Sequence, residues 1–266
     1  MSVYIHGGLR SPIGVLNGQY KHMRPEILGS QVIDEIINRY TISHIDGIFC
    51  GNAVGTGGNL GRLMGLMCNL PNSVPAITVD MQCASALMSI EIAYAHIVSG
   101  IMDSAIAGGI ESSSLQPERV YASGDDREGA YKVAQFTPQD QSPLAMLEGA
   151  ERTIHKHNVT KEDLYPHIIG SHQRASAALD NPYLQSYIMP ITIDGKRCID
   201  ECIRPTMNEK LLSRMKPLLG ADSITNAGNA CLTHDGAAFV YLSNKKGPFK
   251  IYSVKPWAGN PQFSPE

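Results

Sequence analysis

The sequence predicts an α/β layered fold that carries an inserted, α-rich loop segment. Three observations support this prediction. Strand-like and helix-like segments alternate over the first 114 residues. One of the helix candidates is apolar on almost every side. Between Leu115 and Asp235 the alternation stops, and turn-rich stretches surround two better helix candidates. We therefore expect a layered domain that is interrupted once along the chain.

The alternating segments follow from the spacing of apolar residues. Alternating or continuous apolar runs predict strands, whereas apolar residues three or four positions apart predict helices. Strands are expected at residues 3–8, 45–54, 76–80 and 104–110, and helices at 25–40, 62–70 and 83–99. Because strands and helices alternate, we expect a largely parallel sheet.

The helix expected at residues 83–99 has almost no polar face. Leu87, Ile90, Ile92 and Ile97 lie on different sides of it, with small or apolar residues between them. A helix that is apolar all round is normally buried. This segment therefore predicts a central helix buried between layers, as half of a thick αβα arrangement.

The turn-rich segment and the strand patterns that follow it suggest a division of the chain into domains. Residues 115–235 are predicted to form the inserted loop domain, with helices at 144–157 and 171–179. Buried-strand patterns resume at 236–242 and 250–254. We expect residues 1–114 to form the first part of an N-terminal domain, and residues 236–266 its closing strands and the start of a linker.

Composition excludes several classes of function. With 43% hydrophobic and 18% charged residues and a formal net charge of −3, nothing indicates binding to nucleic acid or to an anionic membrane. No stretch approaches the roughly 18 apolar residues that cross a bilayer. The sequence runs from Met1 directly into a strand candidate, and its six cysteines show no pairing pattern. We therefore expect a reducing, cytoplasmic setting.

Cys83 stands in a setting that favours nucleophilic chemistry. It follows a strand candidate and a short turn and begins a helix candidate, with Ala84, Ser85 and Ala86 after it. A thiol at a helix N-terminus faces unpaired N–H groups, which favour the thiolate, and small neighbours let a substrate approach. The alternative is that Cys83 is simply a small buried apolar residue.

Two other groups of residues invite functional interpretations. Gly55, Gly57, Gly58 and Gly61 lack the spacing of a phosphate-binding loop and are better read as a tight strand-to-helix turn. Cys198 and Cys202 have no second ligand pair nearby, so no metal site is expected.

Motifs along the whole chain, in shared order and spacing, resemble those of the thiolases (acetyl-CoA acetyltransferases and 3-ketoacyl-CoA thiolases). They are Arg10-Ser11-Pro12-Ile13-Gly14, residues 55–66, Asp80-Met81-Gln82-Cys83-Ala84-Ser85-Ala86-Leu87, Ala107-Gly108-Gly109-Ile110-Glu111-Ser112, Ser171-His172-Gln173-Arg174-Ala175 with Arg204-Pro205, and Ala227-Gly228-Asn229-Ala230-Cys231 followed by His234-Asp235-Gly236-Ala237-Ala238.

The resemblance implies a layered thiolase-like fold and acyl transfer from acyl-CoA thioesters. Cys83 matches the cysteine that accepts the acyl group, which is covalent catalysis by an activated thiol. The residues implied to contact CoA are Met146, Ala227, Gly228 and Cys231. Coenzyme A is then part of the substrate, with no other cofactor and no metal.

The rest of the family's catalytic set has no counterpart here. The second cysteine, the histidine and the water-binding asparagine of thiolases belong to a C-terminal domain, and their motifs do not occur among these 266 residues. The sequence alone gives no reason to place His155, His157, His172 or His234 near the Cys83 thiol. The motifs also differ in detail, because Cys231 replaces a serine that contacts CoA and Leu147 replaces a glycine.

Three hypotheses remain open. The first is a thiolase-type acyltransferase, truncated and inactive as this chain alone. The second is a non-catalytic acyl-CoA-binding or assembly module that kept the thiolase shape. The third places the chain among the related ketoacyl synthases, although the motifs from Ser171 to Ala238 favour a thiolase. Because an uncovered first domain would expose a large apolar face, we expect a homo-oligomer or a partner that supplies a separate C-terminal half.

Overall fold

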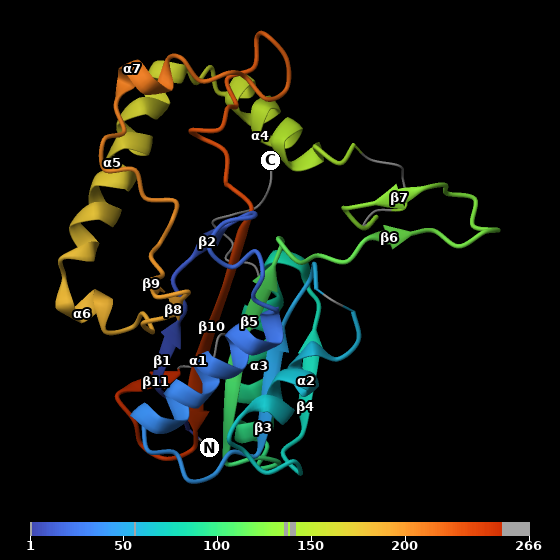
Figure 1. Ribbon diagram of the computed structural model, residues 1–266, viewed down its shortest axis with the longest axis vertical. Coiled ribbons are helices and arrows are strands. Elements are labelled where there is room, and N and C mark those ends of the chain that lie inside the picture. Colours follow the sequence, from blue (N-terminus) through green and yellow to red (C-terminus); the bar gives the residue numbers. More distant parts are fainter. Residues whose placement is uncertain (1, 56, 136–137, 139–141, 252–266) are drawn as a thin grey trace, which may run out of the picture.

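A mixed sheet, covered by helices on both faces, forms the body of the protein (Figure 1). The computed structural model describes residues 2–55, 57–135, 138 and 142–251. Helices α1 (Pro25–Arg39) and α2 (Leu60–Met67) lie on one face of the sheet, and α3 (Ser85–Val98) lies on the other. The α/β layered class predicted from the sequence is confirmed.

The sheet is mixed, which corrects the expectation of a largely parallel one. Its strand order is β11 (Phe249–Ile251), β1 (Val3–Arg10), β10 (His234–Ser243), β5 (Ser104–Ser112), β3 (Gly47–Gly51) and β4 (Ala76–Val79), and β2 (Gly14–Val15) pairs with β10. Among the strands that the structure describes, only β3–β4 and β3–β5 are parallel pairs. The chain leaves β5 and returns to β10 at the same edge of the sheet, so β10 must run antiparallel to β5.

The larger core lies between the sheet and helices α1 and α2. Leu28, Val32, Ile33 and Ile36 form the buried stripe of α1, at the helical spacing that the sequence shows. Gly29 lets the two helices approach closely, because a Cβ at this position would lie 2.2 Å from the sulfur of Met64 in α2. Burial of these apolar side chains stabilises this half of the sheet.

Helix α3 is buried on one face only, which corrects the expectation of a helix buried all round. Ser85, Ser89, Ala93 and Ile97 form its buried stripe, whereas the side chain of Leu87 is 68% exposed. The stripe consists mainly of small residues, which allow α3 to lie close to the sheet. Ser89 also donates a hydrogen bond to the carbonyl of Gly108 in β5 at 2.7 Å and accepts one from its N–H at 3.0 Å.

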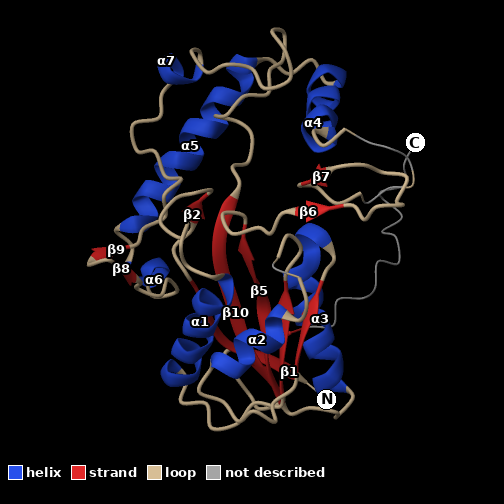
Figure 2. Cartoon of the chain, turned by 45° about the vertical axis from the view of Figure 1, so that its right-hand side comes forward, coloured by secondary structure: helices blue, strands red, loops and turns tan. Residues whose placement is uncertain are grey.

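Between β5 and β10 the chain forms a group of helices and two small hairpins, of which some lie beyond one end of the sheet and others beside it (Figure 2). None of its described strands joins the main sheet. A small core of its own contains Tyr165, Met207 and Leu212. The elements are β6 (Arg119–Val120), β7 (Ala130–Tyr131), α4 (Ala145–Lys156), α5 (Lys161–Leu179), α6 (Pro182–Gln185), β8 (Thr192–Ile193), β9 (Lys196–Arg197) and α7 (Glu209–Leu212).

Helix α5 starts ten residues before the expected position. A capping box explains this start, because Thr160 accepts a hydrogen bond from the N–H of Asp163 and the Asp163 carboxylate accepts one from the N–H of Thr160. The strand expected at 250–254 is observed as β11, and residues 252–254 lie outside the described part of the chain. The division into domains at 1–114, 115–235 and 236–266 stays a prediction.

Candidate functional site

The candidate site lies at the edge of the sheet where β3, β4 and β5 end and β10 begins. The carboxyl ends of parallel strands share one edge, and ligand sites of layered α/β folds occur there. The turn after β4 carries Cys83, and the loop after β3 begins at Asn52. The sequence motifs that resemble thiolases at residues 80–87, 107–112 and 234–238 therefore meet in one place.

Cys83 sits in an exposed turn whose backbone is held by side chains. It is the middle residue of a 3-10 turn, η1 (Gln82–Ala84), directly before α3. Gln82 adopts a φ of 53°, a conformation that costs a non-glycine residue about 1–3 kcal/mol. The hydrogen bonds from Gln82 N to Asp80 Oδ1 (2.9 Å) and from Ser85 Oγ to the Gln82 carbonyl (2.6 Å) hold this turn. The strained turn presents the thiol at the surface.

Glycine in β3 allows the N-terminus of α3 to lie against the sheet. A Cβ at Gly51 would lie only 2.5 Å from the backbone nitrogen of Ala86, and one at Gly109 would lie 3.1 Å from the Cβ of Ala86. Both positions require glycine for this close approach. The first turn of α3, and with it Cys83, is therefore placed by direct contact with β3 and β5.

A cavity of about 460 Å³ opens beside Cys83. Its lining includes the thiol turn, the loop after β3, the end of β5 and the start of β10. Glu111 holds one wall, because its carboxylate accepts hydrogen bonds from Ala53 N (3.0 Å), Val54 N (2.8 Å) and the side chain of Asn52 (2.9 Å). In the motif at residues 107–112, Glu111 is thus a structural acid that positions the loop after β3.

His234, the first residue of β10, lines the same cavity as Cys83. Side chains alternate along a strand, and Leu242 and Val240 of β10 pack in the core beneath α3. The pairing of β10 with β5 has no register shift, so His234 lies on this same face of the sheet. The sequence analysis did not predict that His234 lies near Cys83. The period-two pattern of residues 234–242 could have indicated it, because it puts His234 on the same face of the sheet as Val240 and Leu242.

The start of β10 is tied to the end of β5 by polar contacts. Asp235 is buried and accepts hydrogen bonds from the N–H of Ser114, at 3.0 Å, and from its hydroxyl. Ser113 donates to the carbonyl of His234 at 3.1 Å. These contacts fix the backbone that carries His234.

Two of the predicted CoA-contacting residues line a second, larger cavity. Gly228 and Cys231 lie in a space of about 590 Å³ between α4, α5 and the loop at residues 225–231. Ala227 is exposed, the side chain of Met146 is 76% exposed, and neither is among the residues that line the two cavities. The structure thus brings Gly228 and Cys231 together in one cavity and places Cys83 at the other.

Glu151 of α4 holds the loop that lines the larger cavity. Burial opposes its ionisation, but hydrogen bonds from the Thr225 hydroxyl, from Ile224 N (2.7 Å) and from Thr225 N (3.0 Å) hold the pKa of Glu151 at about 2. His155 lies 3.2 Å from the same carboxylate. Glu151 is therefore a positioning residue, which sequence reasoning did not single out.

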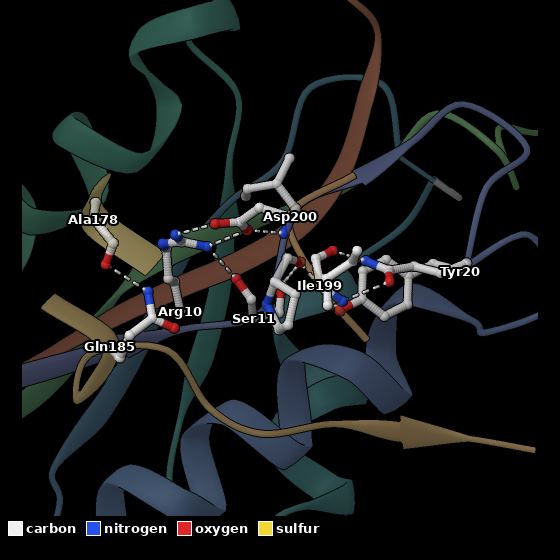
Figure 3. Close-up of polar contacts among 10 residues, drawn as sticks. Arg10, Ser11, Tyr20, Ala178, Gln185, Ile199 and Asp200 are labelled. Atoms are coloured by element: carbon white, nitrogen blue, oxygen red, sulfur yellow. Dashed lines mark hydrogen bonds and ion pairs between the residues drawn. The ribbon is translucent and has the colours of Figure 1, made fainter. Parts of the chain in front are cut away.

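The Arg-Ser-Pro motif near the N-terminus holds another loop in place (Figure 3). Arg10 makes two parallel contacts with Asp200, at 2.8 and 2.7 Å, and Asp200 also accepts a hydrogen bond from Ile13 N at 2.7 Å. Burial opposes the charge on Asp200, yet the Arg10 and Ile13 contacts lower its pKa. Tyr20 donates to the carbonyl of Pro12 at 3.0 Å. The motif thus joins β1 to the chain after β9.

Comparison of the sequence with known proteins agrees with this geometry. Residues 3–246 match the profile of the family described as "Thiolase, N-terminal domain". A Staphylococcus epidermidis protein named "Putative acetyl-CoA C-acetyltransferase VraB" is 33% identical over 243 residues, which are 88% of this chain and 62% of that protein. The protein of the same name from Staphylococcus aureus strain MSSA476 is 31% identical over 91% of this chain and 65% of its own length.

Solved structures show the same relationship. The Bacillus anthracis acetyl-CoA acetyltransferase superimposes with a TM-score of 0.79 at 26% identity, over 91% of this chain and 65% of that one. Human mitochondrial 3-ketoacyl-CoA thiolase, solved in complex with CoA, gives 0.79 at 25% identity, over 91% of this chain and 64% of that one. The chain thus spans 62–65% of the length of these four relatives.

The described residues include no helix that is long and apolar enough to cross a membrane. The thiolase-like fold expected from the motifs is confirmed by the superpositions. With a family match that covers nearly all of the described chain, this protein belongs to the thiolase family and contains its N-terminal domain.

Proposed function

We propose that Cys83 accepts an acyl group from an acyl-CoA thioester, as the first half-reaction of an acetyl-CoA C-acyltransferase. The observation that carries this proposal is the exposed thiol on a strained, side-chain-locked turn at the mouth of a cavity, in the N-terminal domain of a thiolase. Strain held at one turn is characteristic of functional sites.

Three features support acyl transfer at this position. The thiol is exposed, so a thioester can reach it. The turn places Cys83 directly before the N-terminus of α3, where unpaired N–H groups favour negative charge on a sulfur or on a developing oxyanion. The cavity offers space of about 460 Å³ beside the sulfur, which is enough for a short acyl group.

The larger cavity is the proposed site for the pantetheine part of CoA. Gly228 and Cys231 line it, and a structural relative has been solved with CoA bound. Met146 and Ala227, the other two residues implied by the resemblance, stay predictions as contacts at its rim. In this proposal CoA is part of the substrate, and the reaction uses no metal and no other cofactor.

The proposal is tested by incubating the protein with acetyl-CoA and mapping the adduct by mass spectrometry. Acetylation of Cys83, with loss of the adduct in Cys83→Ser, is the expected result. Cys231 is also exposed and serves as an internal control in the same molecule. Equal acetylation of both thiols indicates unspecific exchange and overturns the proposal, as does the absence of any adduct on Cys83.

A second candidate function is a non-catalytic acyl-CoA-binding or assembly module. The observation that favours it is the lining of the larger cavity, where Cys231 replaces a serine that contacts CoA and Leu147 adds bulk in place of a glycine. Calorimetry distinguishes the two functions. CoA binding that is unchanged in Cys83→Ala, together with no acyl adduct in the wild-type protein, supports the binding module.

A further inference from the structure

The cavity beside Cys83 contains a titratable side chain that no structural contact employs. Four titratable side chains line it, namely Cys83, Glu111, Asp235 and His234. Glu111 binds the N–H groups of the loop after β3, and Asp235 binds Ser114. Within the part of the chain that the structure describes, neither ring nitrogen of His234 has a hydrogen-bond partner in the protein. Its imidazole is therefore free to contact a bound molecule.

The backbone holds this imidazole on the side of the sheet where Cys83 lies. His234 is half-buried, and both its own carbonyl and its neighbour Asp235 are anchored to the turn after β5. Side chains two positions apart on β10 share one face, so Gly236 and Ala238 lie between His234 and the first turn of α3. Both residues line the cavity. Because these two side chains are small, the space between His234 and Cys83 stays open to a ligand.

Acyl transfer to a thiol requires that a proton reach the leaving sulfur. The Cys83 sulfur forms a new bond to the acyl carbon, the bond from that carbon to the CoA sulfur breaks, and the thiol proton of Cys83 must end on the CoA sulfur. An imidazole can carry this proton near neutral pH because it accepts at one nitrogen and donates from the other. The alkyl thiolate of CoA is more basic than an aryl thiolate, so it gains more from protonation as it leaves.

We propose that His234 carries the proton from Cys83 to the leaving CoA sulfur, so that this chain supplies its own acid–base group for acylation. The inference rests on the proposed acyl transfer to Cys83. An amide at this position could not exchange a proton in this way.

The test compares wild type with His234→Asn, which replaces the imidazole by an amide that cannot transfer a proton. His157→Asn is the matched control, because His157 is exposed at the end of α4 and lines neither cavity. Single-turnover acylation of Cys83 is followed by mass spectrometry with two thioesters, acetyl-CoA and S-phenyl thioacetate. Alkylation of Cys83 by iodoacetamide provides a third rate that involves no leaving thiol.

We expect His234→Asn to slow acylation by acetyl-CoA at least about 100-fold, the usual contribution of a general acid–base group. Acylation by S-phenyl thioacetate should fall by a much smaller factor, because a thiophenolate leaves without a proton and only the removal of the Cys83 proton is affected. Alkylation should fall by the same smaller factor, because it also needs the Cys83 thiolate and has no leaving thiol, and added imidazole should restore part of the rate with acetyl-CoA. The His157→Asn variant should behave as wild type in all arms.

Two results overturn the inference while leaving the proposed function intact. One is a wild-type acylation rate in His234→Asn with acetyl-CoA. The other is an equal loss in all three arms, because that places the whole effect at Cys83 and shows that His234 delivers no proton to the CoA sulfur. If the wild-type protein is acylated by neither thioester, the proposed function itself fails and the role of His234 falls with it.

Discussion

Arg10 and Asp200, which are 190 positions apart in the sequence, form a two-point ion pair that joins the end of β1 to the loop after β9. The side chain of Asp200 is 12% exposed and that of Arg10 is 33% exposed, so the pair lies at the border of the interior. A planar guanidinium matches a carboxylate in this arrangement better than any other side chain. The pair therefore fixes how the intervening segment returns to the sheet.

Removing Arg10 should destabilise the fold. Arg10→Ala leaves the Asp200 carboxylate with the Ile13 N–H as its remaining hydrogen-bond donor among the described residues. We expect the free energy of unfolding in denaturant to fall by about 1–3 kcal/mol, with solvent screening of the half-exposed Arg10 setting the lower figure. Arg152→Ala, an exposed arginine of α4, should change it by less than about 0.5 kcal/mol. Equal losses in the two variants would contradict the role of the pair.

Glu151 should make stability depend on pH. Its pKa in the folded protein is about 2, below the ordinary value of 4.5, because the hydrogen bonds from residues 223–225 outweigh the opposing effect of burial. A lowered folded pKa adds stability that is fully present above the unfolded pKa and is lost as the pH falls from about 4.5 towards about 2. In Glu151→Gln the free energy of unfolding should be lower at neutral pH and should decline less on acidification.

The control for this prediction is Glu148→Gln in the same helix. The Glu148 side chain makes no hydrogen bond within the described residues, so its replacement should leave the wild-type decline unchanged. Denaturant titrations at a series of pH values measure both variants. Parallel curves for wild type and Glu151→Gln would show that the loop contacts do not depend on this charge.

Gly51→Ala and Gly149→Ala should have opposite effects on stability. At Gly51 the added Cβ meets backbone atoms of α3 at 2.5 Å, so the helix must move and the loss should be about 1–3 kcal/mol. At Gly149, within α4, the nearest atom is a flexible arginine end at 3.6 Å, and the gain should be about 0.5–1 kcal/mol. Thermal unfolding distinguishes the two, and slower acylation of Cys83 should accompany only the change at Gly51.

Four of the six cysteines should react in two groups. Cys83 and Cys231 are exposed, whereas burial raises the pKa of both Cys50 and Cys68 to about 12. Because the thiolate is the nucleophile, iodoacetamide should label Cys83 and Cys231 in the native protein and reach Cys50 and Cys68 only after unfolding. Peptide mapping over time measures the order. Early labelling of Cys50 would show that the core between the sheet and α1 opens in the native state.

The exposed face of α3 should mediate association. Leu87, with Met81 and Ile77 of the preceding segment, leaves an apolar surface beside Cys83 on the described chain. We predict that light scattering detects self-association that grows with protein concentration and is weakened by Leu87→Glu. Ile199→Glu, at a 63% exposed apolar residue elsewhere, is the control. A wild-type protein that stays monomeric at all concentrations would contradict this prediction.

The sequence by itself determined the local elements and the identity of the candidate nucleophile. The apolar stripe of α1, the strands β4 and β5, and the turn that carries Cys83 all follow from periodicity and motif spacing, because these signals act over a few residues. The start of α5 could also have been read from Thr160 and Asp163, whose capping box is a local pattern.

Tertiary structure alone decided which distant residues share a site. The apolar composition of α3 suggested complete burial, yet its small residues face the sheet and Leu87 faces outward, since packing selects one stripe of a helix. The antiparallel return of β10 is set by where the long segment after β5 ends, and periodicity carries no information about that. That return places His234 in the cavity of Cys83, a pairing across 151 positions that no local signal encodes.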